Sequence, residues 1–169
     1  MPFRTLWNKT YDVRFRLPDQ FIFELKIDGF RALAHIEAGR GKLISRNGNV
    51  FRGFVDLAAW IAEHLRVESA VLDGEIACVD ESGRPVFRDL LFRRRQCVFI
   101  AFDLLYLNGK DLRALPLIER KTMLKKLLRR KRSRIVYLDH VEGDGRLLFE
   151  QIVAMDLEGI CLQAEGLTI

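Results

Sequence analysis

Glu24, Lys26 and Asp28 alternate with the apolar residues Leu25 and Ile27 near the start of the sequence. In an extended strand, side chains two residues apart share a face, so the three charged groups would point one way and the two apolar groups into a core. A neutral lysine amine can attack phosphorus, but the ordinary lysine pKa is about 10.4 and neighbouring carboxylates raise it further. A reactive Lys26 therefore requires a divalent cation or desolvation in a closed site. Without such a site, the segment is typical of an edge strand whose charges face solvent.

The elements that would position Lys26 are short strands and helices in mixed order. Extended patterns predict strands over 21–27, 31–36, 71–79, 98–107 and 159–163, and apolar residues at helical spacing predict helices over 54–65, 117–130 and 147–155. Glycine-containing turn signals at 39–41 and 47–48 are typical of hairpins. This mixture favours an α+β fold with mainly antiparallel sheets.

Length and composition favour one folded domain. A chain of 169 residues, 49% hydrophobic and 30% charged, is long enough to bury a core and too apolar for disorder. No apolar run approaches the roughly 20 residues of a membrane helix, and no apolar stretch follows the N-terminal basic residues as it would in a signal peptide. We therefore expect a single domain over 1–169 without membrane association.

Charge and cysteine content bear on partners and location. The net charge of +5 is compatible with a polyanionic partner such as nucleic acid or nucleotide phosphate. Cys78, Cys97 and Cys161 are widely spaced and odd in number, so they fit neither a zinc pattern nor a disulfide framework. A reducing, cytoplasmic location is expected on this basis.

The segment that begins at Lys26 carries a specific signature. Residues 26–31 read KIDGFR, which matches the K-x-D-G-x-R motif of the covalent nucleotidyltransferases, the superfamily of DNA ligases, RNA ligases and mRNA capping enzymes. The sequence continues with SRNG at 45–48, LDGE at 72–75, FDLLYLNG at 102–109 and EGI at 158–160. Together these segments resemble the successive motifs of ATP-dependent DNA ligases, most of all the short bacterial type in the ligase module of end-joining repair enzymes. The resemblance spans about residues 20–163 and implies a nucleotidyltransferase fold, with mainly antiparallel sheets flanked by helices.

The resemblance implies a catalytic role for Lys26. This residue corresponds to the lysine that attacks the α-phosphate of ATP, leaving a lysyl-AMP phosphoramidate and releasing pyrophosphate. Glu24 corresponds to a residue at the adenine edge, and Phe102 to the aromatic residue that stacks on adenine. Asp28 belongs to the same signature and is counted with the nucleotide-binding residues. The implied acceptor of AMP is a 5′-phosphate in nicked double-stranded DNA.

Arginines and carboxylates complete the implied site. Arg31 and Arg46 correspond to arginines around the ribose and phosphates, where a guanidinium donates forked hydrogen bonds. Glu75 corresponds to a carboxylate that contacts the ribose hydroxyls or helps to hold metal, and Glu158 to one associated with Mg²⁺ or Mn²⁺. Taken singly, each has an ordinary alternative, because exposed arginines and solvated carboxylates are common and an aromatic residue such as Phe102 usually packs in a core. Only the joint order of the motifs favours the functional interpretation.

Some charged residues are informative without a motif. Asp103 lies inside the apolar run 98–107, where a carboxylate must find a partner. Basic stretches at 93–95 and 129–134 could contact DNA phosphates, but the second also suits the solvated end of a helix, where cations complement the helix dipole.

The pattern departs from that of the family toward the end of the sequence. Family members carry a lysine where this chain has Gln163, and a neutral amide cannot replace an ammonium that faces an α-phosphate. Members then continue to a strand with two more lysines and to an oligonucleotide-binding barrel, neither of which precedes Ile169. Charged groups that stabilise phosphate oxygens contribute orders of magnitude to rate. We therefore expect weak or absent adenylation by this chain, and nick sealing only with a separate barrel domain or repair partner protein.

Two other functional hypotheses stay open. A degenerate, non-catalytic nucleotide- or DNA-binding module is favoured by Gln163 and the missing lysines. An RNA ligase or capping enzyme shares the lysine signature but fits the FDLLYLNG segment less well.

Overall fold

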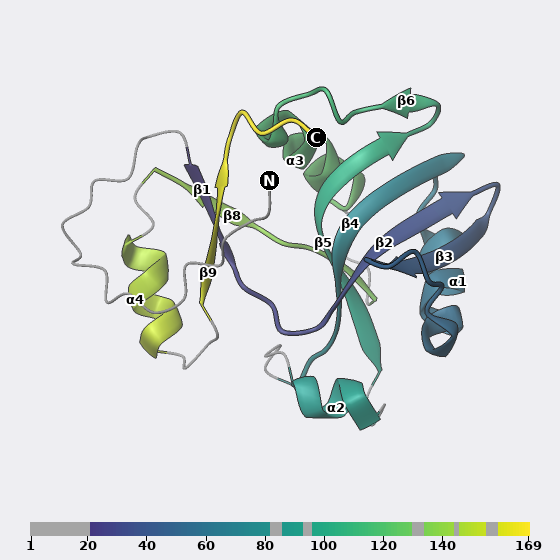
Figure 1. The fold of residues 1–169 in the computed structure, drawn as a ribbon, viewed down its shortest axis with the longest axis horizontal. Helices are drawn as coiled ribbons and strands as arrows, with labels where there is room; N and C mark the ends of the chain where they lie inside the picture. The colour runs from purple at the N-terminus through teal and green to yellow at the C-terminus, as the bar shows by residue number, and fades with distance from the viewer. Residues whose placement is uncertain (1–20, 82–85, 93–95, 130–133, 144–145, 155–158) are drawn as a thin grey trace.

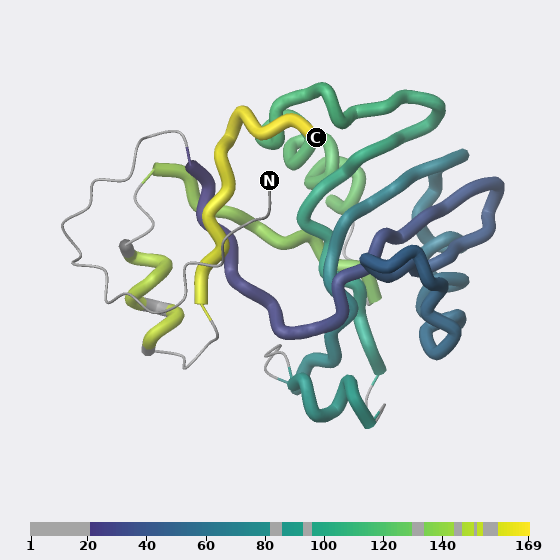
Figure 2. The backbone as a smooth tube through the Cα atoms, viewed as in Figure 1, coloured from purple at the N-terminus to yellow at the C-terminus, as the bar shows by residue number. Residues whose placement is uncertain are grey.

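Two β-sheets form the framework of the structure, which is a computed structural model. The structure describes residues 21–81, 86–92, 96–129, 134–143, 146–154 and 159–169. Within these ranges the larger sheet has six strands, in the order β3-β2-β4-β5-β6 with β7 beside β5, and the smaller has three, in the order β8-β1-β9. Figure 1 shows the sheets on either side of the connection between β1 and β2, which Figure 2 traces as a continuous tube. Lys26 lies at the beginning of this connection.

The larger sheet is built mainly from antiparallel neighbours. Its strands are β2 (Phe30–Glu37), β3 (Arg40–Ser45), β4 (Ser69–Cys78), β5 (Cys97–Leu107), β6 (Lys110–Asp111) and β7 (Ile135–Tyr137). Only the β5–β7 pair among those described is parallel. Ala38 and Gly39 connect β2 to β3 with φ angles of 47° and 74°, the left-handed geometry that two-residue hairpin turns favour.

Helices cover one face of the larger sheet and adjoin the smaller one. The described helices are α1 (Val55–His64), which follows the short 3₁₀ turn η1 (Arg52–Phe54), α2 (Phe87–Phe92), α3 (Leu117–Leu127) and α4 (Arg146–Ala154). α1 packs on β3 and α3 on β5, and their apolar side chains meet those of the strands in one core that includes Leu43, Ile61, Leu72 and Phe99. Among the helices described, none is long and apolar enough to cross a membrane.

The smaller sheet places the strand before Lys26 in a different setting from the one expected. β1 (Phe21–Leu25) is the central strand, between β8 (His140–Glu142) and β9 (Ile160–Ala164). The edge-strand interpretation is therefore wrong, because a central strand has neighbours on both sides, and Glu24 is only 2% exposed. The strand also ends at residue 25 rather than at 27.

The α+β class with mainly antiparallel sheets is confirmed. Every strand and helix predicted from residue spacing is present, with ends that differ by at most three residues. The described elements that spacing did not predict are β3, η1, α2, β6, β7 and β8, which have two to six residues each. For β3, only the hairpin turn that precedes it was predicted.

A disulfide joins Cys78 and Cys97, which face each other across β4 and β5. The expectation that the cysteines form no disulfide is therefore wrong, because strand pairing brings together two residues that are 19 positions apart. Cys161 remains as a free thiol. Cysteine spacing consequently gives no support for a reducing location.

Candidate active site

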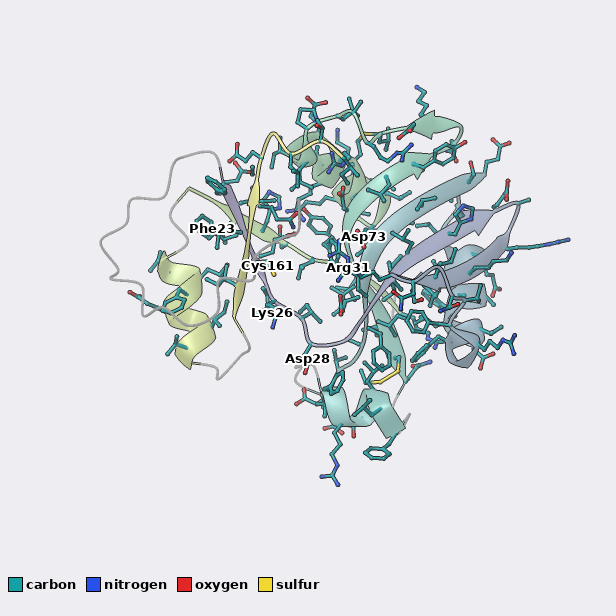
Figure 3. The ribbon with its side chains drawn as sticks, in the orientation of Figure 1. Phe23, Lys26, Asp28, Arg31, Asp73 and Cys161 are labelled. Carbon is teal, nitrogen blue, oxygen red and sulfur yellow. A yellow bond between two sulfur atoms is a disulfide. The ribbon has the colours of Figure 1, made fainter. Side chains whose placement is uncertain are left out.

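Lys26 lies where the chain leaves the smaller sheet for the larger one (Figure 3). It is the first residue after β1, and its backbone N–H donates a hydrogen bond of 2.9 Å to the carbonyl oxygen of Gly159, next to the start of β9. The residue is half-buried. The backbone of Lys26 is thus fixed beside β9, while its side chain keeps some access to solvent.

Cys161 on β9 lies close to several of the predicted site residues. It lies opposite Glu24 in the β1–β9 pairing and interacts electrostatically with Glu24, Lys26, Arg31 and Glu75. Burial raises the pKa of the Cys161 thiol, and the two carboxylates raise it further, while the lysine and the arginine oppose them. These neighbours come from β1, the segment after it, β2 and β4. Residues from separate motifs therefore converge between the two sheets (Figure 3).

Arg31 is oriented by two neighbours on the larger sheet. Its guanidinium forms a forked ion pair with Asp73 of β4, with Nη2–Oδ2 at 2.8 Å and Nε–Oδ1 at 3.2 Å, and this hydrogen bonding raises the pKa of Arg31. The guanidinium carbon also lies 5.2 Å from the centre of the Phe102 ring, within cation–π range. The Arg31 side chain is 61% exposed. Because a guanidinium has five donors and the aspartate takes two, Arg31 is held in place and still able to bind an anion.

Glu24 is the most buried of the predicted site residues that the structure describes. Its carboxylate accepts hydrogen bonds from Lys121 Nζ on α3 and from the Gln163 side-chain amide on β9. Lys121 is fully buried, so both charges of this ion pair are removed from water. The alternative interpretation, in which the charges of this strand face solvent, is wrong for Glu24, because Lys121 of α3 pairs with it.

Phe102 and Asp103 are neighbours on β5 with different partners. Phe102 is half-buried and lies under Arg31, whereas Asp103 is buried and forms a forked ion pair with Arg120 of α3, at 2.9 Å for both contacts. The expectation that a carboxylate in this apolar run must have a partner is confirmed. Arg120 Nη1 also donates to the carbonyl oxygen of Leu167 at 2.9 Å, so this pair ties α3 to the residues after β9.

Of the remaining predicted residues, Glu75 lies beside Arg31, whereas Asp28 and Arg46 lie farther along the chain from the residues around Cys161. Glu75 faces Arg31 in the β2–β4 pairing. Asp28 lies farther along the β1–β2 connection (Figure 3). Arg46 is exposed in the turn after β3, one position beyond the Ser45–Ala32 pair, and no described contact joins it to the other site residues. Glu158, predicted to bind metal, lies outside the described residues, as do 93–95 and 130–133 of the basic stretches.

Reasoning from the sequence missed three residues at this site: Asp73, Lys121 and Cys161. Lys121 lies in the predicted helix 117–130 and was not assigned a role. The signal that could have placed it is its spacing, since Leu117, Lys121 and Leu124 share one helix face. Asp73 directly precedes Gly74 and Glu75 in a matching motif, but its partner comes from another strand.

A groove with a volume of about 400 Å³ lies elsewhere on the larger sheet. It is lined by residues that include Leu33, Val71 and Tyr106, and by none of the predicted site residues. We base the candidate site on the convergence of charged groups, because a nucleotide is bound through its phosphates by such groups.

Gly29 in the lysine signature is required by a close approach of two backbones. A Cβ atom at this position would lie 2.3 Å from the carbonyl oxygen of Ile76 and 2.7 Å from Cγ of Glu75. We expect Gly29→Ala to lower the free energy of unfolding by about 1–3 kcal/mol, as overpacking does. Urea unfolding followed by circular dichroism measures this change.

Gly166→Ala is the matched control, because a Cβ atom there would have no neighbour within 4 Å. It should leave stability unchanged or slightly higher, since alanine restricts the unfolded chain. Equal stability of the two variants would show that β4 does not approach Gly29 as described.

Comparison with known proteins gives the family. A family model described as the ATP dependent DNA ligase domain matches residues 8–168. The chain belongs to this family. The expected nucleotidyltransferase fold is confirmed by the solved structure of mycobacterial DNA ligase D complexed with ATP and MES, which has a TM-score of 0.74 and 29% identity and matches 89% of this chain. Chlorella virus DNA ligase-adenylate, with a TM-score of 0.60 and 18% identity over 89% of this chain and 56% of that one, shows the fold alone.

Curated relatives of this ligase-family chain include an end-joining protein and a DNA ligase. The multifunctional non-homologous end joining protein LigD of Pseudomonas aeruginosa is 32% identical over 147 residues, which are 83% of this chain and 18% of that protein. DNA ligase 2 of Methanosarcina mazei is 33% identical over 162 residues, which are 87% of this chain and 27% of that protein. The chain spans 50% of the mycobacterial structure. It therefore corresponds to a part of each of these proteins.

Proposed function

We propose that this chain is the adenylation core of an ATP-dependent DNA ligase of the end-joining repair type, in which Lys26 accepts AMP from ATP for nick sealing. The observation that carries the proposal is the convergence of Glu24, Lys26, Arg31 and Glu75 around Cys161. Lys26 and Arg31 belong to the lysine signature, Glu24 lies two positions before it, and Glu75 belongs to a separate motif on β4. The fold brings these residues to one place. Membership in the ligase family supports the same conclusion.

In the proposed step, the neutral amine of Lys26 forms an N–P bond to the α-phosphate of ATP. The bond from that phosphorus to the bridging oxygen breaks, pyrophosphate leaves with the electron pair, and the amine loses a proton to solvent. Arg31 is oriented by Asp73 and has donors left for phosphate oxygens. The Phe102 ring offers a face for the base. Electrostatic stabilisation of phosphate oxygens is the main contribution that such a site makes.

Mg²⁺ or Mn²⁺ belongs to this proposal. Among the described residues, no group of three or more His, Cys, Asp or Glu side chains could form a protein cage for a metal ion. Mg²⁺ bound to a nucleotide takes most of its ligands from phosphate and water and needs only one or two carboxylates, and Glu75 fits that need. When bound, the ion would neutralise phosphate charge and favour the neutral form of a nearby lysine.

Intact mass spectrometry after incubation with ATP and Mg²⁺ tests the function directly. A mass gain of one AMP supports the adenylation core. The second candidate is a non-catalytic nucleotide-binding module, which the Gln163–Glu24 hydrogen bond favours because it turns this amide toward a carboxylate. ATP binding by calorimetry without any mass gain would support that module instead.

DNA is the proposed substrate of the complete enzyme. The chain's net charge of +5 suits a polyanion, and nick sealing would require a barrel domain or a repair partner protein to enclose nicked duplex DNA. The proposed location is the cytoplasm, because the proposed reaction consumes ATP. A nick-sealing assay with and without an added oligonucleotide-binding domain tests this requirement.

Cys161 provides a chemical probe of the nucleotide site. Because its thiol pKa is raised, the reactive thiolate is scarce near pH 7, and we expect slow alkylation by iodoacetamide that accelerates as the pH rises through 9 and above. ATP with Mg²⁺ should slow the reaction further, since Lys26 and Arg31 lie around the thiol. Mass spectrometry of the alkylated peptide measures both effects. A rate unaffected by ATP would place the nucleotide elsewhere.

A further inference from the structure

One buried ammonium connects Glu24 and Phe102, the two residues proposed to contact the adenine base. Lys121 on α3 has no exposed side-chain surface. Its Nζ donates hydrogen bonds to the Glu24 carboxylate, to the carbonyl oxygen of Phe102 at 3.1 Å and to that of Leu138 at 3.2 Å. An ammonium has three donors, so these acceptors satisfy it. Lys121 therefore holds Glu24 and the backbone at Phe102 at once.

The Glu24 carboxylate has a different partner on each oxygen. Lys121 pairs with Oε1, and Gln163 Nε2 donates to Oε2. The amide adds a hydrogen bond without adding charge, so this ion pair keeps one cation for one anion. A lysine at position 163 would bring a second ammonium to a single carboxylate. The neutral side chain at 163, which departs from the family pattern, is thus suited to the presence of Lys121.

We propose that Lys121 is the positioning residue that holds Glu24 and Phe102 in place for the nucleotide base, and that Gln163 is the neutral third partner that this ion pair requires. The positioning role rests on the proposed function, because it concerns ATP. The requirement for a neutral side chain at position 163, called the charge requirement below, concerns only the stability of the folded chain and does not involve ATP. Removing one partner from a buried ion pair leaves an uncompensated charge, whereas supplying a new partner restores the balance.

The charge requirement is tested by unfolding the full chain in urea without nucleotide. The variants are Lys121→Met, Gln163→Lys and the double variant, with Lys125→Met as the control on the exposed side of the same helix. We expect each of the first two to lower the urea midpoint, and the double variant to recover most of the loss because one ammonium again faces Glu24. The control should not shift.

Non-additivity decides the outcome of the unfolding experiment. If the loss of stability in the double variant equals the sum of the losses in the two single variants, the charge requirement is overturned. If Lys121→Met does not fold, a double variant that folds supports the proposal, and one that does not fold refutes it. Neither result depends on whether the chain transfers AMP.

The positioning role is tested by the kinetics of AMP transfer. In Lys121→Met, which leaves Gln163 unchanged, the Phe102 carbonyl loses its charged donor. We therefore expect the KM for ATP to rise about tenfold, the equivalent of one hydrogen bond to a charged group, with little change in kcat. An unchanged KM, or a loss confined to kcat, would refute this role. A parent chain that neither binds ATP nor accepts AMP would refute the proposed function and the positioning role, while the unfolding result would still decide the charge requirement.

Discussion

Lys26→Ala should abolish the transfer of AMP from ATP to the chain. The phosphoramidate needs a neutral amine at this position, and alanine provides no nucleophile. Lys26→Arg should be equally inactive, because a guanidinium stays protonated at any pH at which the protein is folded. Incubation with ATP labelled at the α-phosphate, followed by a denaturing gel, measures the labelled fraction. We expect it to fall below detection in both variants.

The control for this experiment is Lys110→Ala, which removes an exposed lysine from β6. It should keep the labelling of the unmodified chain. Both alanine variants should also keep the urea midpoint, so that a loss of labelling reports chemistry rather than folding. Labelling that persists in Lys26→Ala would assign the acceptor to another residue and remove the basis of the proposed mechanism.

Arg120→Met should cause the largest loss of stability among single substitutions in α3. The Arg120 side chain has no exposed surface, and it pairs with Asp103 through two hydrogen bonds of 2.9 Å. Removing it leaves a buried carboxylate without its counter-ion, which costs about 3–5 kcal/mol. It also removes the contact with the carbonyl oxygen of Leu167. Urea unfolding measures the change.

Arg113→Met is the matched control, because Arg113 forms the same kind of ion pair with Asp111 in an exposed position. Water screens that pair, so its loss should leave the unfolding midpoint where it was. Equal effects of Arg113→Met and Arg120→Met would show that the Asp103–Arg120 pair is not shielded from water. A stable Arg120→Met variant would contradict the packing of α3 on β5.

Much of the fold could be predicted from residue spacing. Strand and helix positions follow from periodic burial, which is a local property, and the Asn-Gly and Gly-rich turns follow from backbone conformation. The partner of Asp103 could be expected, although not identified, because a carboxylate in an apolar run must be compensated. The order of the motifs along the chain is sufficient to indicate the ligase family.

The environment of each site residue could not be predicted in the same way. Alternation placed Glu24 on the same face of a strand as Lys26 and Asp28, but alternation does not say what covers either face. The counter-ion of Glu24, Lys121, is 97 positions away on another element, which residue spacing does not reveal. The cysteine disulfide was missed for the same reason, since only the pairing of β4 with β5 brings Cys78 to Cys97.

The sequence by itself determined where most of the longer strands and helices form, which lysine carries the signature and which family the chain resembles. The tertiary structure alone decided that Glu24 is buried against Lys121 and Gln163, that Asp73 orients Arg31, and that Cys161 lies among the motif residues. The reason is physical. Backbone conformation and side-chain periodicity depend on neighbours within a few residues, whereas burial and charge pairing depend on which distant segments pack together.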